Sequence, residues 1–159
     1  MIISGQHLMK DEKSKYILNW IREISKIRPE LGNFAICPYA SNANFKILDE
    51  KLCKIVPKPD FDVVIYVVED NIDAEFLYNA VDDYNQNYPD YKFIADHGKT
   101  KTYIQNIQTS NGKYNLVLCQ PRKELTEARK KLAKTDYYDY WDESYLKEVL
   151  EDDFSEVIE

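Results

Sequence analysis

Residues 61–68 are the feature that most constrains the fold, because they form an almost continuous run of apolar side chains, Phe-Asp-Val-Val-Ile-Tyr-Val-Val. A strand with one solvated face alternates between apolar and polar residues, whereas a strand covered on both faces does not. Most of these side chains are also β-branched or aromatic, which favours a strand over a helix. The run therefore predicts a central strand that is covered on both faces.

The segments around this run have the periodicity of further helices and strands. Amphipathic helices are predicted over residues 9–28, 73–86 and 122–134. Strands are predicted over residues 91–95 and 114–119, with a short one at Leu52–Val56. Residues 101–109 fit either a strand or a helical turn, and Ser110-Asn111-Gly112 is typical of a turn.

The order of these elements predicts the fold class. Strands and helices are mixed along the chain, and one pair of strands is expected to form a hairpin. We predict an α+β fold with a single mixed or antiparallel sheet and with helices on one face. A ferredoxin-like arrangement is the nearest named architecture, and a long N-terminal helix precedes it. Residues 1–134 form a single domain in this interpretation, and residues 135–159 form a C-terminal extension.

Charge is segregated between these two parts. Residues 135–159 carry ten acidic side chains and one basic one, while the other 134 residues carry 18 acidic and 20 basic ones. Neither part has the basic stripe of a nucleic-acid-binding protein, so we expect no direct binding of nucleic acid. No stretch approaches the roughly 20 apolar residues of a membrane-spanning helix, so we expect no membrane partner.

Three cysteines, Cys37, Cys53 and Cys119, show no CxxC spacing, and the chain has only two histidines. This pattern argues against a disulfide framework and against a zinc site. We therefore expect reduced thiols in a cytoplasmic protein that holds no metal and needs no cofactor.

Cys37 is the leading candidate for chemistry, in the segment Phe34-Ala-Ile-Cys-Pro-Tyr-Ala40. Proline lacks a backbone donor and biases the preceding residue toward an extended conformation, so the thiol should lie on an irregular segment. Three interpretations stay open: a nucleophile, a ligand contact, or a buried structural thiol, which is common for cysteine.

Two resemblances involve this segment. Cys37-Pro38-Tyr39 resembles the start of the glutaredoxin motif, in which the nucleophilic thiolate lies at a helix N-terminus; Ala40 stands where that motif has its second cysteine. Over about residues 20–40, Trp20 and the Gly32–Ala40 segment resemble an uncharacterised bacterial family with a tryptophan-bearing helix followed by Gly-Leu-Asn-Leu-Cys-Pro-Phe-Ala. This second resemblance implies that Cys37, Pro38 and Arg122 share a site.

Polar residues elsewhere complete a hypothetical site around Cys37. His97 is the natural base for the thiol, and Asn33 and Tyr39 would shape the pocket. Lys99 and Arg122 would supply positive charge to a ligand. The loop that contains His97 and Lys99 has two interpretations, an anion-binding loop and an ordinary solvated connection.

The C-terminal extension combines its acids with aromatic residues, including Tyr137, Tyr140 and Trp141. A purely disordered acidic tail would contain few aromatics. The aromatics either pack onto the body of the protein or dock onto a basic partner protein.

These observations support two functions from different classes. The first is a small cytosolic thiol-dependent enzyme or small-ligand binder centred on Cys37, with His97 as the second catalytic residue. The alternative is a non-enzymatic interaction protein that docks a partner through its extension. The abundance of Asn, Lys, Ile and Tyr is common in products of AT-rich genomes, including those of phages, which suits this alternative.

Overall fold

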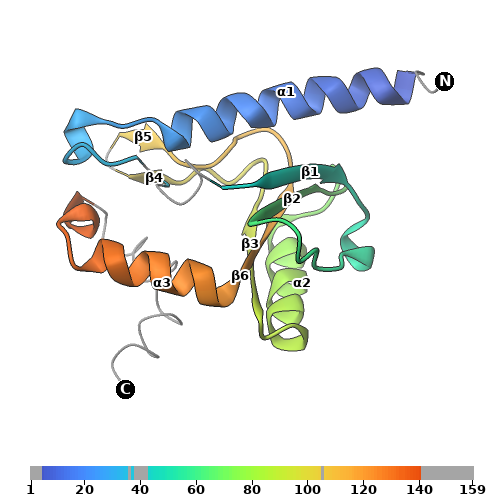
Figure 1. Ribbon diagram of the computed structural model, residues 1–159. Coiled ribbons are helices and arrows are strands. Elements are labelled where there is room, and N and C mark those ends of the chain that lie inside the picture. The colour runs from blue at the N-terminus through green and yellow to red at the C-terminus, as the bar shows by residue number, and fades with distance from the viewer. Residues whose placement is uncertain (1–4, 36, 38–42, 105, 141–159) are drawn as a thin grey trace.

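The computed structural model describes residues 5–35, 37, 43–104 and 106–140, and it confirms an α+β fold (Figure 1). Three α-helices, a four-stranded mixed sheet and a two-stranded hairpin make up the described part of the chain. In chain order these are α1 (Gly5–Ser25), β1 (Phe45–Asp49), β2 (Val63–Val67), α2 (Ala74–Asn87), β3 (Tyr91–Asp96), β4 (Tyr103–Ile104), β5 (Ile107–Gln108), β6 (Leu116–Pro121) and α3 (Arg122–Ala133). Short 3-10 helices occupy Pro29–Leu31, Leu52–Lys54 and Tyr137–Tyr140. None of the described helices is both long and apolar enough to cross a bilayer.

Strand β2 is the central strand that the apolar run predicts. All five of its residues are buried, and it pairs with β1 on one side and with β6 on the other. Val64 and Tyr66 pack in one hydrophobic cluster with α2, whereas Ile65 and its neighbours on the opposite face pack against Ile17 of α1. The sheet is therefore covered on both faces at β2, as the pattern requires.

The sheet has the strand order β1-β2-β6-β3. Strand β6 is antiparallel to both β2 and β3, so β2 and β3 run in the same direction, and α2 connects them. This β2-α2-β3-β6 unit is the split βαβ part of a ferredoxin-like arrangement. The outer position beside β2 belongs to β1, which runs parallel to β2. A ferredoxin-like fold has its last strand there, antiparallel to its neighbour, so the complete arrangement is not formed.

The prediction that the helices lie on one face is wrong. Figure 1 shows α2 on one side of the sheet and α1 and α3 on the other. Leu116 packs in the cluster of α1, and Leu118, on the same face of β6, lines a cavity together with Leu125 of α3. The continuous apolar run of β2 explains this outcome, because its second face also needs a helix to exclude water.

Two local expectations also differ from the structure. Leu52–Lys54 form a 3-10 helix instead of a strand, and β1 lies earlier, at Phe45–Asp49. Helix α1 ends at Ser25 instead of near residue 28, since Pro29 starts a separate 3-10 turn. The ends of α2 and α3 agree with the predicted helices to within a residue or two.

Candidate functional site

A cavity of about 540 Å³ lies on the face of the sheet that α1 and α3 cover, and it extends past the edge strand β3 to residues of α2, among them Tyr78, Asp82 and Asn85. Trp20 and Ile24 of α1, Ala128 of α3 and Leu118 of β6 contribute apolar parts of its wall. Polar groups come from β3, β6 and the segment around the β4–β5 hairpin. A cavity of this size and mixed character is typical of a site for a small organic molecule, since such sites usually measure about 300–1,000 Å³.

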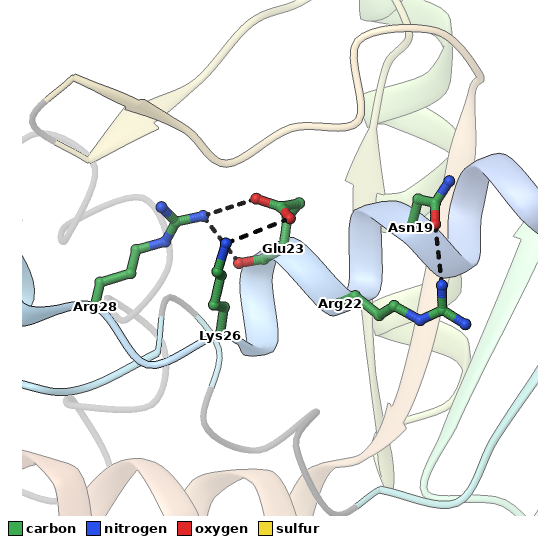
Figure 2. A network of polar contacts seen from close by, with 5 residues as sticks. All are labelled: Asn19, Arg22, Glu23, Lys26 and Arg28. Carbon is green, nitrogen blue, oxygen red and sulfur yellow. Dashed lines mark hydrogen bonds and ion pairs between the residues drawn. The ribbon is translucent and has the colours of Figure 1, made fainter.

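Cys37 reaches this cavity because the chain reverses direction after α1. Figure 2 shows the polar contacts at the end of that helix, where Arg28 donates hydrogen bonds to the carbonyl oxygen and to the carboxylate of Glu23, at 3.1 and 3.3 Å. The backbone N–H of Asn33 then bonds to the carbonyl oxygen of Arg28, which closes a tight turn. After the turn, the backbone N–H of Cys37 donates to the carbonyl oxygen of Ile24 at 2.7 Å.

The Cys37 side chain is half-buried in the cavity wall. It packs against the small cluster of Ile24, Leu31 and Ile104. Cys53, in contrast, is exposed on the surface, and Cys119 is buried in the core on the side of α2. Burial raises the pKa of the Cys119 thiol to about 12, so this thiol stays protonated at neutral pH. Of the three cysteines, Cys37 is the one in the wall of the cavity.

Asp96, at the end of β3, supplies a carboxyl group to the same wall. Its Oδ2 accepts hydrogen bonds from the backbone N–H of Asn111 at 3.0 Å and from Asn111 Nδ2 at 2.8 Å. Burial raises the pKa of Asp96 to about 6, although these hydrogen bonds and the nearby His97 lower it. Asp96 therefore changes its charge close to neutral pH, in contact with the cavity.

Gln120 of β6 is the most unusual polar residue in the wall. The residue is only 5% exposed, and its Oε1 has no hydrogen-bond partner among the described residues. A buried acceptor without a donor costs roughly 1–3 kcal/mol, so such atoms are rare in folded proteins. Lys92, its pairing partner on β3, and Arg129 of α3 also line the cavity. The wall thus combines two acidic side chains, Asp82 and Asp96, with two basic ones and an amide oxygen that accepts no hydrogen bond from the described residues.

His97, the predicted base, lies outside the cavity wall. Its ring is buried, with Nε2 at 2.6 Å from the carbonyl oxygen of Ile72 and Nδ1 accepting the backbone N–H of Lys99 at 3.1 Å. The two ring nitrogens therefore tie the segment that follows β3 to the residues just before α2. The structure does not bring His97 together with Cys37 at the cavity, and its catalytic role stays a prediction without geometric support.

The predicted ligand contacts are also dispersed. Asn33 is exposed in the turn after α1, where its φ of 68° is a left-handed conformation that asparagine tolerates. The Lys99 side chain is exposed, and Arg122 donates to the carbonyl oxygens of Pro89 and Tyr91 at 3.0 and 3.4 Å, which fastens the start of β3. None of these three residues lines the cavity. Tyr39 lies outside the described residues.

The start of the C-terminal extension packs against the body. Tyr137 is 3% exposed, its ring contacts that of Phe34 edge-on at 5.3 Å, and it lines the cavity. The side chain of Tyr140 and the whole of Trp141 lie outside the described part of the chain, so docking of a basic partner protein there stays a prediction.

Sequence reasoning missed Asp96 and Gln120 as site residues. A partial signal is present, because Lys92 lies within the predicted strand 91–95, and Asp96 and Gln120 directly follow the predicted strands 91–95 and 114–119. Alternation along a strand places Lys92, Ile94 and Asp96 on one face. This face can be recognised as part of a cavity only when it is known that α3 packs on the same face of the sheet as α1.

Metal binding finds no support in the part of the chain that the structure describes. No group of three or more His, Cys, Asp or Glu side chains is arranged there to hold a metal ion. The cavity wall offers two carboxylates, those of Asp82 and Asp96, together with one thiol, hydroxyl groups and amides, which suit an organic ligand better than a cation such as Zn²⁺.

Comparisons with known proteins identify no relative. No family model matches the chain, and neither does any curated protein or any solved structure. The functional interpretation therefore rests on the geometry of the cavity.

Proposed function

We propose that this protein binds a small organic molecule in the cavity between α1, α3 and the β3–β6 face of the sheet. The observation that carries this proposal is that Gln120 lines a cavity of about 540 Å³ while its buried Oε1 receives no hydrogen bond from the part of the chain that the structure describes. Natural proteins seldom leave such an atom unsatisfied unless a ligand or a water molecule completes it.

Thiol-dependent chemistry at the same cavity is the second candidate. It is favoured by the position of Cys37 in the wall, where a bound molecule would lie against the thiol. A thiol-dependent enzyme would lose its activity on Cys37→Ala, whereas a binding protein would keep its affinity for the ligand in this variant.

The proposal is tested by screening a fragment library against the protein and measuring the rate at which iodoacetamide alkylates each cysteine. A fragment that occupies the cavity should slow the alkylation of Cys37 and leave that of the exposed Cys53 unchanged. Peptide mass spectrometry after timed quenching reports both rates from one sample, so Cys53 is an internal control.

A matched pair of variants on α3 locates the binding. Ala128 lines the cavity, whereas Ala133 is exposed at the end of the same helix. Ala128→Trp should fill the cavity and abolish binding of the fragments, and Ala133→Trp should leave it intact. Fragments that bind equally well to both variants, or that never protect Cys37, would show that the cavity is not the binding site.

A further inference from the structure

The polar groups of the cavity wall restrict the chemistry of its ligand, and this inference rests on the proposed function. Gln120 defines one end. Gln120 lines the cavity and its Oε1 has no hydrogen-bond partner among the described residues, so a ligand that presents an N–H or O–H group to this amide would satisfy it. Lys92 lies opposite Gln120 in the strand pairing and also lines the cavity. A neutral hydroxyl or amide group is a sufficient donor for the neutral amide oxygen of Gln120.

Asp96 defines the other end. Both hydrogen bonds from Asn111 go to its Oδ2, and none from the described residues goes to Oδ1. The carboxylate is largely shielded from water, and its Oδ1 can still accept a hydrogen bond. A cationic donor forms the strongest hydrogen bond with such a group. Trp20 lines the cavity as well, with its Nε1 fixed to the carbonyl oxygen of Thr109 at 2.9 Å. Indole rings attract cations, which adds to the preference for an ammonium group.

The surface between these two ends is apolar. Ile94 and Leu118 pair across β3 and β6, and both line the cavity between Asp96 and Gln120. Asp96 pairs with Leu116, which is four residues from Gln120 along β6. At about 3.3 Å per residue the two ends are about 13 Å apart. A hydrogen bond of about 2.8 Å at each end leaves roughly 7–8 Å between the polar groups of the ligand.

From this arrangement we propose that the cavity binds an amphipathic primary amine, with its ammonium group at Asp96, an apolar body over Ile94 and Leu118, and a neutral hydroxyl or amide donor at Gln120. Each part of the ligand interacts with one part of the cavity wall. The charge of the amine balances Asp96, the neutral donor satisfies Gln120, and the apolar body replaces water over the paired side chains.

The test compares three probes that share one skeleton. Tyramine carries an ammonium group and a phenol at opposite ends of an apolar body. Phenethylamine lacks the phenol, and 3-(4-hydroxyphenyl)propionate has a carboxylate in place of the ammonium group. Binding is followed by NMR titration of the amide signals of β6 and α3. Tyramine should bind about tenfold more tightly than either analogue, since each lost interaction is worth about 1.4 kcal/mol.

Two variants assign the two ends separately. Gln120→Leu should remove the preference for tyramine over phenethylamine, and Asp96→Asn should remove the preference for tyramine over the carboxylate. Gln120→Met, which keeps the length of the side chain, replaces the first variant if circular dichroism shows that Gln120→Leu is unfolded. Preferences that survive in the folded variants would overturn the assignment of those ends.

Different experimental outcomes would refute this inference and the proposed function. Tighter binding of the carboxylate than of tyramine, with the same amide signals perturbed, would refute the amine and leave the cavity as a ligand site. If neither these probes nor any fragment perturbs those signals, the ligand site itself is refuted. Equal affinity for tyramine and phenethylamine in the unmodified protein would indicate that Gln120 is satisfied by water, and would also refute the neutral donor.

Discussion

Asp96 joins the cavity to the Ser110–Gly112 turn, since its carboxylate receives two hydrogen bonds from Asn111. Burial raises its pKa from 3.8 to about 6. Between about pH 4 and pH 6 the folded protein therefore holds a proton that the unfolded chain has lost, so this group contributes less stability as the pH rises. The penalty for ionised Asp96 is complete above pH 6 and amounts to about 3 kcal/mol at most.

The variant Asp96→Asn should remove this dependence, because an amide keeps the contacts of Asn111 without titrating. We expect the free energy of unfolding of Asp96→Asn, relative to that of the unmodified protein, to increase between pH 4 and pH 7. Urea unfolding at intervals of one pH unit measures the difference, and other titrating groups cancel in it. A constant difference across this range would show that Asp96 is not stabilised in its protonated form.

His97 has a structural role that a second substitution can separate from catalysis. The variant His97→Ala removes both contacts of the ring, to the Ile72 carbonyl oxygen and to the Lys99 backbone N–H, and leaves a void. We expect a loss of about 2–4 kcal/mol in the free energy of unfolding. The alkylation rate of Cys37 should stay unchanged, because His97 does not line the cavity. A stable variant with a slowed Cys37 reaction would instead identify His97 as the base for the thiol.

At the scale of the elements, the strands and helices with strong periodicity could be predicted from the sequence. Strand β2 and helix α2 have patterns that only one kind of element satisfies. Strand β1 was missed because its exposure is mixed and it pairs with only one neighbour, which leaves a weak alternation. The 3-10 helix at Leu52–Lys54 was mistaken for a strand because two or three apolar residues bury equally well in either conformation.

The candidate site could be predicted only in part for a related reason. Cys37 is unusual in its own local sequence, so it could be found there. Asp96 and Gln120 become site residues only through the packing of α3 on the side of α1. No local pattern in α3 specifies which face of the sheet it will cover, because an amphipathic helix buries its apolar stripe equally well on either.

The connection between β3 and β6 depends on a close approach of two backbone segments. A β-carbon on Gly98 would lie 2.6 Å from the carbonyl oxygen of Lys113 and 2.8 Å from its carbonyl carbon. Backbone atoms cannot move aside as a flexible side chain can. The Gly98 N–H also donates to Asn115 Oδ1 at 2.8 Å, which holds the two segments together.

The variant Gly98→Ala should therefore lower the free energy of unfolding by about 2–4 kcal/mol, as expected for a steric conflict within a packed region. Gly112→Ala is the matched control. Its φ of 75° adds strain of about 1 kcal/mol, but the nearest atom to the new β-carbon is the end of the Gln108 side chain, which can move. Thermal and urea unfolding compare the two. Equal losses of unfolding free energy in the two variants would show that the backbone at Lys113 can move aside for the new β-carbon.

At the scale of the whole molecule, the two faces of the sheet have different roles. The face toward α2 holds a continuous hydrophobic cluster that includes the buried Phe93 and Leu77. The face toward α1 divides into a packed part around Ile17 and the cavity below Trp20 and Ile24. The second face thus supplies the helix that closes the sheet and most of the walls of the candidate site, to which α2 adds residues at the edge of the sheet.

Helix α1 should therefore contribute to stability and enclose the cavity at the same time. Ile17 is fully buried against Val63, Ile65 and Leu116, so Ile17→Ala should lower the free energy of unfolding by about 3 kcal/mol. Lys15, on the exposed side of the same helix, is the matched control, and Lys15→Ala should change this free energy by less than about 0.5 kcal/mol.

Because Trp20 and Ile24 move with α1, the alkylation of Cys37 should become faster relative to that of Cys53 in Ile17→Ala and stay the same in Lys15→Ala. A destabilised Ile17→Ala that leaves the relative rate of Cys37 unchanged would show that the cavity keeps its walls independently of the packing of α1 on the sheet.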